Sequence, residues 1–169
     1  MVGHSPGSGT HDRVPRRHGG DFASSRYPNP VDRAEAIDIR PNGSIVVAGS
    51  TTDHPLRGQT RFALARYLRD GSLDTTFNGD GRVRTSFGPR RVDQAFGVAV
   101  QDDGRIVAAG WNTKDTDLDV ARYTSDGDLD ERFGDSGRVT LAGESAVDVA
   151  IQTDGKLVTA GGILARFEN

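Results

Sequence analysis

GVAVQDDGRIVAAG, residues 97–110, decides the fold, because variants of it recur as AIDIRPNGSIVVAG at 36–49 and DVAIQTDGKLVTAG at 148–161. Each copy alternates apolar residues, reaches an Asn-Gly or Asp-Gly pair, and then continues through β-branched residues to Ala-Gly. Alternation over four to eight residues is typical of a β-strand with one buried face. The pattern therefore predicts three similar β-hairpins.

The turn glycines of these hairpins are Gly43, Gly104 and Gly155, which lie 61 and 51 residues apart. Asn-Gly and Asp-Gly favour two-residue hairpin turns of the primed type, whose central residues have positive φ. We therefore expect positive φ at all three glycines. A motif that recurs at such intervals indicates a tandem-repeat architecture.

A second block follows each hairpin: FALARYLRDGSLDTTFNGDGRV at 62–83, LDVARYTSDGDLDERFGDSGRV at 118–139, and a shorter ILARFEN at 163–169. Each complete block holds a strand, an Asp-Gly turn, a Leu-Asp-x-x-Phe segment and a Gly-rich corner before a last strand. In the second repeat we expect strands at about 96–101, 105–110, 119–124 and 138–141. Four short antiparallel strands in one repeat are the pattern of a β-propeller blade.

The fold class predicted from these repeats is all-β, with consecutive four-stranded antiparallel blades of β-propeller type packed face to face in an incomplete ring. Residues 26–169 form the tandem repeat domain, with about two full blades and a partial third. Residues 1–25 are rich in Gly, Ser, His and Arg without periodicity, which favours a flexible tail. A closed propeller needs at least about four blades. We therefore expect self-association, or further repeats of a longer protein.

The first repeat resembles the bacterial delta-sixty repeat. Three segments carry the resemblance: AIDIRPNGSIVVAG at 36–49, LARY at 64–67 and DGSLDTTFNGDG at 70–81. The resemblance extends from Asp32 to the end of the chain. It implies a β-propeller-like domain of unknown function, of a kind found as repeats in large bacterial proteins that are often secreted. The chain departs from that family in having two full repeats and a stub, and in lacking an apolar signal-peptide segment within residues 1–20. The resemblance thus suggests a secreted or cell-surface protein and leaves the compartment open.

Composition excludes several classes of site. The 169 residues include 22 Gly and no Cys, so a disulfide framework, a thiolate zinc site and a cysteine nucleophile are ruled out. The net charge of −3 gives no general attraction to nucleic acid or to an anionic membrane. No stretch is long and apolar enough to cross a bilayer. We expect no nucleic-acid partner, no membrane insertion and no cofactor.

Strand alternation also predicts the core. The expected buried residues are the apolar positions that recur between repeats: Ile37, Ile39, Ile45, Val47, Leu64, Leu73, Phe77, Val98, Val100, Ile106, Val120, Leu129, Phe133, Val149, Ile151, Leu157 and Leu164. These side chains should pack between consecutive blades.

One arginine recurs in each repeat, as Arg66, Arg122 and Arg166. Asp74 and Asp130 follow the first two after eight residues, which favours a structural arginine–acid clamp that holds the intervening turn. The alternative is a row of guanidinium groups that bind an anionic ligand. If the clamp is right, both arginines should be buried against their acids, and Arg166, which has no acid downstream, should be more exposed.

Trp111 is the only tryptophan, and it follows an Ala-Ala-Gly sequence at a position where the other repeats have Ser50 and Gly162. Its uniqueness favours a place at the rim, where an aromatic ring can stack on a sugar or a protein partner. With Asp115 and Asp117 it forms a candidate ligand-binding site.

The alternating carboxylates Asp126, Asp128 and Asp130 are similar to the first half of a calcium loop. The twelfth position is Gly137 instead of Glu and the sixth is Glu131 instead of Gly, so we interpret these residues as turn carboxylates and expect no metal site. All four histidines lie in the tail or in a variable loop, which gives a hydrolase triad no rigid scaffold: His4, His11, His18 and His54.

The sequence therefore predicts a non-catalytic structural or interaction module of β-propeller type, with its ligand open. The alternative is a carbohydrate-binding or carbohydrate-active propeller. That alternative requires aromatic rings and paired carboxylates on one loop face, for which only Trp111 with Asp115 and Asp117 is a candidate.

Overall fold

The computed structural model describes residues 32–54, 59–112 and 116–167, which form eleven β-strands connected by turns. The predicted tail and its three histidines lie outside these ranges, as does Asp115. Where the chain is described it contains no helix, and the all-β prediction is confirmed.

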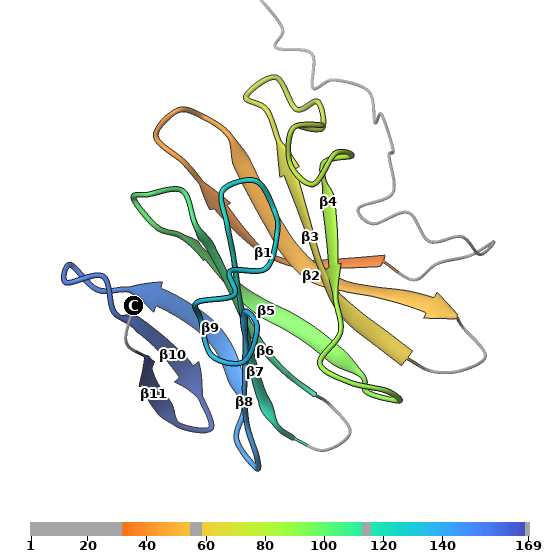
Figure 1. Ribbon diagram of the computed structural model, residues 1–169, viewed down its shortest axis with the longest axis vertical. Coiled ribbons are helices and arrows are strands. Elements are labelled where there is room, and N and C mark those ends of the chain that lie inside the picture. The colour runs from red at the N-terminus through yellow and green to blue at the C-terminus, as the bar shows by residue number, and fades with distance from the viewer. Residues whose placement is uncertain (1–31, 55–58, 113–115, 168–169) are drawn as a thin grey trace, which may run out of the picture.

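The strands form three antiparallel sheets in chain order (Figure 1). Blade 1 consists of β1 (Asp32–Ile39), β2 (Ile45–His54), β3 (Gln59–Tyr67) and β4 (Arg82–Thr85). Blade 2 consists of β5 (Asp93–Val100), β6 (Ile106–Asn112), β7 (Leu118–Tyr123) and β8 (Arg138–Leu141). Blade 3 consists of β9 (Ala146–Ile151), β10 (Leu157–Gly161) and β11 (Leu164–Phe167).

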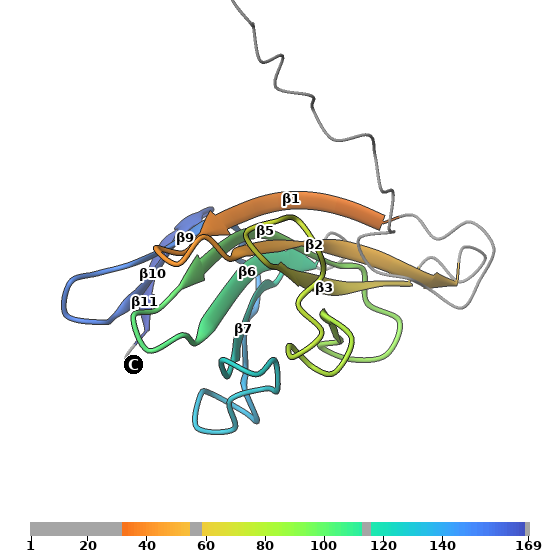
Figure 2. The ribbon, with the colours of Figure 1, turned by 90° about the horizontal axis from the view of Figure 1, so that it is seen from above.

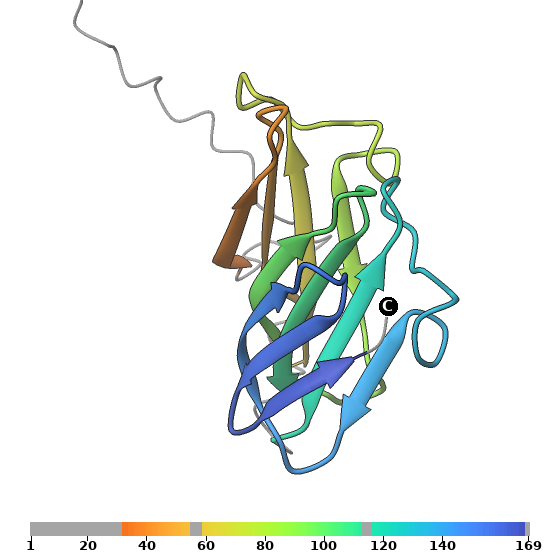
Figure 3. The same ribbon diagram turned by 90° about the vertical axis from the view of Figure 1, so that its left-hand side faces the viewer.

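The blades fan out from their first strands. Strand β1 contacts β5, and β5 contacts β9 (Figure 2). Strands β4 and β8 lie at the outer edges of their sheets (Figure 1). The three sheets are therefore stacked face to face, and the described strands do not close into a ring (Figure 3). The predicted fold class, antiparallel blades of β-propeller type in an incomplete ring, is confirmed.

The turn glycines have positive φ as expected, at 84° for Gly43, 89° for Gly104 and 82° for Gly155. The prediction of a two-residue primed turn is wrong, because the residue before each glycine does not have the left-handed conformation that such a turn requires. Each loop has three residues: in the first, the Gly43 amide donates to the Arg40 carbonyl at 2.8 Å, and only the glycine is left-handed. The Asn42 side chain accepts from the Ser44 amide at 3.0 Å, which stabilises this longer turn.

Glycine is required at the end of each hairpin motif for a different reason. Gly49, Gly110 and Gly161 each lie opposite a β-bulge in the first strand of their blade. The bulge brings the backbone of that strand very close: a Cβ on Gly110 would lie 1.9 Å from the Gln94 carbonyl oxygen. Only glycine fits this approach without moving a strand.

Each blade has a front face, toward the next blade along the chain, and a rear face, toward the preceding one. The front face of blade 1 packs on the rear face of blade 2 through side chains that include Val46, Ala48, Leu64, Ile106, Ala108 and Tyr123. The front face of blade 2 packs on the rear face of blade 3 through side chains that include Val107, Ala109, Val120, Val149 and Leu157. Both cores therefore lie between blades.

The core prediction is wrong at three positions. Ile37 and Ile39 are 60% and 63% exposed, and Leu164 is 76% exposed. The first two lie on the rear face of blade 1 and Leu164 lies on the front face of blade 3, and no described blade covers either face. Leu64 and Val120 occupy the same repeat position as Leu164 and are fully buried, so stacking rather than sequence sets the burial.

The other predicted core residues are at least partly buried. Those that are buried are Leu64, Phe77, Val98, Ile106, Val120, Phe133, Val149 and Leu157. Those that are half-buried are Ile45, Val47, Leu73, Val100, Leu129 and Ile151. The prediction missed Val46 and Val107 for two different reasons. Val107 was missed because one buried face was assumed for each strand, whereas blade 2 is covered on both. Val46 was missed because Ile45 and Val47 were chosen on β2, whereas the covered face of that strand is the front one.

Thr159 gives a first test of this packing. Its side chain is buried on the rear face of blade 3, and its hydroxyl has no hydrogen-bond partner among the described residues. We expect Thr159→Val to raise the free energy of unfolding by about 1 kcal/mol, because it removes a buried unsatisfied hydroxyl with little change of shape. Urea unfolding measures the change.

Thr85→Val is the matched control, since buried Thr85 accepts the Tyr123 hydroxyl at 2.8 Å. The same substitution should there lower stability by about 1 kcal/mol, because it leaves the tyrosine hydroxyl unpaired. Equal effects at the two sites would contradict the difference in pairing.

Candidate functional site

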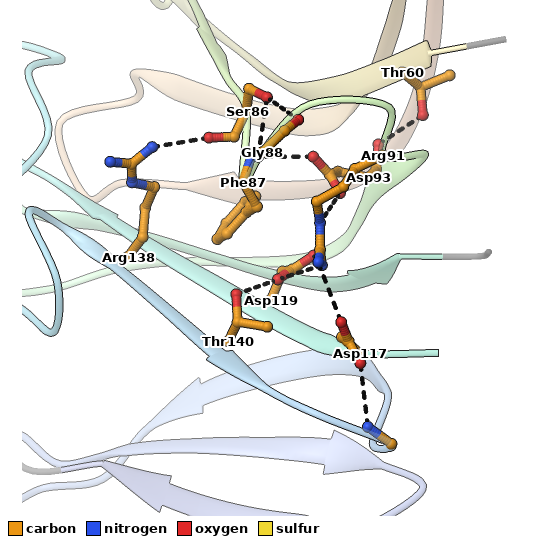
Figure 4. A network of polar contacts seen from close by, with 11 residues as sticks. Thr60, Ser86, Phe87, Gly88, Arg91, Asp93, Asp117, Asp119, Arg138 and Thr140 are labelled. Atoms are coloured by element: carbon orange, nitrogen blue, oxygen red, sulfur yellow. Dashed lines mark hydrogen bonds and ion pairs between the residues drawn. The ribbon is translucent and has the colours of Figure 1, made fainter. Parts of the chain in front are cut away.

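The densest polar cluster surrounds Arg91, in the connection between blades 1 and 2 (Figure 4). Its Nε donates to Asp93 Oδ1 at 3.1 Å, Nη1 to Asp117 Oδ2 at 3.1 Å, and Nη2 to Asp119 Oδ2 at 2.8 Å. One guanidinium thus joins the connection, the start of β5 and the segment that opens β7. We call Arg91, Asp93, Asp117 and Asp119 the Arg91 cluster.

Further hydrogen bonds fix the carboxylates of the Arg91 cluster. Thr140 Oγ1 donates to Asp119 at 2.7 Å from β8, and the Phe87 amide donates to Asp93 at 3.1 Å. The Gly143 amide, in the connection to blade 3, donates to Asp117 at 3.2 Å. The cluster therefore ties both connections between blades to the outer strands of blade 2.

Burial sets the electrostatics of the Arg91 cluster. Asp93 and Asp119 are fully buried, and the cluster places three carboxylates around one guanidinium. Loss of hydration raises the pKa of Asp119 to about 6 and also raises the pKa of Asp93. The hydrogen bonds from Thr140 and Arg91 oppose this rise at Asp119 but do not cancel it.

This shift predicts a pH dependence. The pKa of Asp119 is higher in the folded chain, about 6, than its ordinary value of 3.8, so between these values the folded state binds more protons than the unfolded state. Its contribution to stability therefore falls as pH rises from about 4 to about 6. We expect Asp119→Asn to remove a decline on the order of 1 to 3 kcal/mol over that range. Unfolding free energies of the two proteins that run parallel from pH 4 to 7 would contradict this assignment.

Two cavities flank the connection between blades 1 and 2. One has a volume of about 550 Å³ and is lined by Ser86, Phe87, Gly88, Asp135, Arg138 and Thr140. The other, of about 290 Å³, lies against Thr60, Arg61 and Arg91. Arg91 is engaged by its three acids, and Arg138 donates to the Ser86 carbonyl at 2.9 Å. The cationic groups of Arg91 and Arg138 are therefore committed to contacts within the protein.

The structure brings the first predicted clamp pair together. Arg66 Nε donates to Asp74 Oδ2 at 2.7 Å, and its guanidinium lies 4.7 Å from the centre of the Phe77 ring. Arg66 is 7% exposed, and its Nη1 also donates to the Ser125 carbonyl of blade 2. Hydrogen bonds from Thr76, with the charge of Arg66, lower the pKa of Asp74. The pair holds the turn of its own blade and also joins blades 1 and 2.

The second pair has the same geometry with one addition. Arg122 Nε donates to Asp130 Oδ2 at 3.0 Å, and its guanidinium lies 4.7 Å from the centre of the Phe133 ring. Arg105 Nε also approaches Asp130 Oδ2, at 3.3 Å. Arg166, at the equivalent position in blade 3, is exposed.

Of the three residues in the candidate ligand site, the structure describes Trp111 and Asp117. Trp111 is half-buried on β6, with its ring 6.3 Å from that of Phe96. Asp117 is ion-paired to Arg91, and Asp115 lies outside the described residues. Trp111 and Asp117 therefore serve contacts within blade 2 and with its neighbouring connection.

The turn carboxylates also bond locally. Asp130 Oδ1 accepts from the Arg132 amide at 3.2 Å, and Asp126 and Asp128 are exposed. Within residues 32–54, 59–112 and 116–167, no group of three or more His, Asp or Glu side chains is arranged to hold a metal ion.

Comparison with known proteins agrees with this geometry. Residues 40–77 and 101–133 match a family model described as "Domain of unknown function (DUF5122) beta-propeller". The fold is a β-propeller-type array of blades. Each matched segment runs from the hairpin turn through the clamp phenylalanine, Phe77 or Phe133, so blades 1 and 2 carry the motif in register. No curated protein matches the chain.

The match supports a β-propeller-like domain of unknown function. The delta-sixty repeat is no part of that description and stays a resemblance. No helix among the described residues meets the length and hydropathy needed to cross a membrane.

The Arg91 cluster is the part of these propeller blades that sequence reasoning missed. Arg91 and Asp93 lie in a connection without repeat signal, and the cluster joins residues up to 28 positions apart. One signal was present: Asp119 interrupts an apolar strand, where the equivalent residues are Ala63 and Ile163. An acid between Leu118 and Val120 in a strand buried on both faces indicates a buried cationic partner.

Proposed function

We propose that the chain is a non-catalytic structural or interaction module that binds a polypeptide through the open faces of its terminal blades. One observation carries this proposal: Ile37 and Leu164, 60% and 76% exposed, occupy repeat positions that are buried wherever a neighbouring blade is present. Apolar surface of this kind favours a protein partner.

The polar groups support the same proposal. The clamps and the Arg91 cluster are committed to partners within the protein. Asp119, whose raised pKa resembles that of a general acid, has no exposed surface. A general acid or base must reach the group with which it exchanges a proton, so the burial of Asp119 favours a structural ion pair.

The carbohydrate alternative has less support. A sugar site would require Trp111 and Asp117 to face a ligand, whereas the Trp111 ring lies near Phe96 and Asp117 pairs with Arg91. Binding to a glycan array that is lost in Trp111→Ala, with no change in stability, would favour the alternative instead.

The proposal is tested with a dye that fluoresces on apolar protein surface, such as anilinonaphthalene sulfonate. At low protein concentration we expect the wild-type chain to enhance its fluorescence, and Ile37→Glu and Leu164→Glu each to reduce that signal. Leu68→Glu is the matched control, because Leu68 is 43% exposed but lies in the turn after β3. Absence of enhancement with the wild-type chain would overturn the proposal, since the terminal faces would then be covered.

A further inference from the structure

The two junctions inside the protein follow one rule. Repeat-equivalent residues form them: Val98 and Val149 are 8% and 5% exposed on the rear faces of blades 2 and 3, and Leu64 and Val120 are fully buried on the front faces of blades 1 and 2. Each front face therefore accepts the rear face of the blade that follows it.

The open faces are the unmatched halves of the same junction. On the rear face of blade 1, Ile37 pairs with Val47 and Ile39 with Ile45, so four apolar side chains lie together. On the front face of blade 3, Leu164 pairs with Ala160. Figure 3 looks onto blade 3, and no described element covers its front face.

The front face of blade 3 also carries two exposed charged side chains, because Asp148 pairs with Ala160 and Arg166 pairs with Val158 on the same face as Leu164. Arg66, at the position equivalent to Arg166, donates to the Ser125 carbonyl of blade 2, so an arginine at this position is compatible with a junction.

One hydrogen bond of the first junction has no counterpart on the front face of blade 3. In blade 1 the equivalent face carries Asp38, which accepts from the Val100 amide of blade 2 at 2.7 Å. The equivalent residues are Ala99 in blade 2 and Ala150 in blade 3. Because the junction between blades 2 and 3 forms with Ala99, this hydrogen bond is not required at a further junction.

We propose that the partner is a second copy of this chain, bound head to tail, so that the front face of blade 3 in each copy packs on the rear face of blade 1 in the other. This inference rests on the proposed interaction role of the open faces. Two such junctions give a closed dimer with two-fold symmetry. The dimer has six blades, within the range of four to eight found in closed propellers. Ring closure leaves neither face exposed.

The experiment uses the full chain and sedimentation velocity from about 1 to 300 μM. We expect the wild-type chain to shift with concentration to a species of twice the 18.1 kDa monomer mass. Ile37→Glu and Leu164→Glu should each stay monomeric, because each damages one face of both junctions. Leu68→Glu, outside the faces, should dimerise like the wild-type chain.

Mixing the two face variants is the decisive step. Ile37→Glu keeps an intact front face on blade 3, and Leu164→Glu keeps an intact rear face on blade 1, so an equimolar mixture can form one intact junction. We expect the mixture to regain dimers, weaker than those of the wild-type chain. An interface between two identical faces predicts the opposite: one variant alone would still dimerise, and mixing would restore nothing.

Circular dichroism verifies that both variants are folded. A wild-type chain that stays monomeric at 300 μM would overturn the second-copy proposal. If the same chain still enhances dye fluorescence through Ile37 and Leu164, the interaction role stands and another polypeptide is the occupant. Loss of both signals removes both proposals.

Discussion

Arg66→Ala is expected to lower the free energy of unfolding by about 3 to 5 kcal/mol, because it leaves the buried Asp74 carboxylate without its guanidinium partner. The substitution also removes the contact with the Phe77 ring and the hydrogen bond to the Ser125 carbonyl of blade 2. The substitution therefore removes contacts both within one turn and at the junction between blades 1 and 2. Urea unfolding at low protein concentration measures the change.

The repeat supplies graded controls for this prediction. Arg122→Ala should cost less than Arg66→Ala, since Arg105 remains 3.3 Å from Asp130. Arg166→Ala removes an exposed arginine at the same repeat position and should change stability by no more than about 0.5 kcal/mol. An unfolding midpoint for Arg66→Ala equal to that of Arg166→Ala would reject the clamp.

Removing both members of the Arg66 clamp separates the charge effect from packing. Arg66→Met with Asp74→Leu replaces the ion pair by apolar groups of similar length. We expect the double variant to be more stable than Arg66→Ala, because no buried charge is left unpaired. A double variant as unstable as the single one would mean that packing of the arginine stem, rather than charge, dominates.

Gly110→Ala is expected to lower the free energy of unfolding by about 3 kcal/mol or more, or to prevent folding. The added Cβ would lie 1.9 Å from the Gln94 carbonyl oxygen and 2.8 Å from Ala95 Cα, distances that no side-chain rotation relieves. Strand β5 must move, and β5 is also the strand that contacts the first strands of both other blades. The same unfolding measurement checks this value.

Gly162→Ala is the control for the glycine substitution. A Cβ there would lie 3.1 Å from the Ser145 hydroxyl oxygen, which can rotate away, and Gly162 does not have positive φ. We expect a change in stability below about 1 kcal/mol in either direction, because the smaller entropy of the unfolded alanine variant offsets a mild contact with Ser145. Similar losses at Gly110 and Gly162 would show that the close approach at the bulge does not explain the motif, since chain entropy alone predicts a small gain in stability at both sites.

Local features of the fold could be predicted from the sequence. The hairpins around Gly43, Gly104 and Gly155 require only residues within one turn, and the clamp partners Arg66 and Asp74 are eight residues apart. Such features depend on backbone conformation and on short spacings in the sequence, and the same spacings recur in successive repeats. The turn type was wrong because the side-chain hydrogen bond of Asn42, present in the other hairpins as well, favours a three-residue loop.

The Arg91 cluster could not be predicted in the same way. Its members lie in the connection 86–92, at the start of β5 and at the start of β7, and they meet only when β5, β6 and β7 pair within blade 2. No spacing within one repeat encodes that meeting. The only local sign was Asp119 within an apolar strand, which indicates a buried partner but not its identity.

By itself the sequence determined the strands, the turn glycines, the clamp pairs and the division into blades, because each of these depends on residues close together in the chain. Only the tertiary structure decided which of two equivalent apolar faces is buried. Leu64, Val120 and Leu164 share one repeat position, yet the first two are fully buried and the third is 76% exposed. The physical reason is that a face is buried only where another blade packs on it, and the first and last described blades each have one face on which no described blade packs.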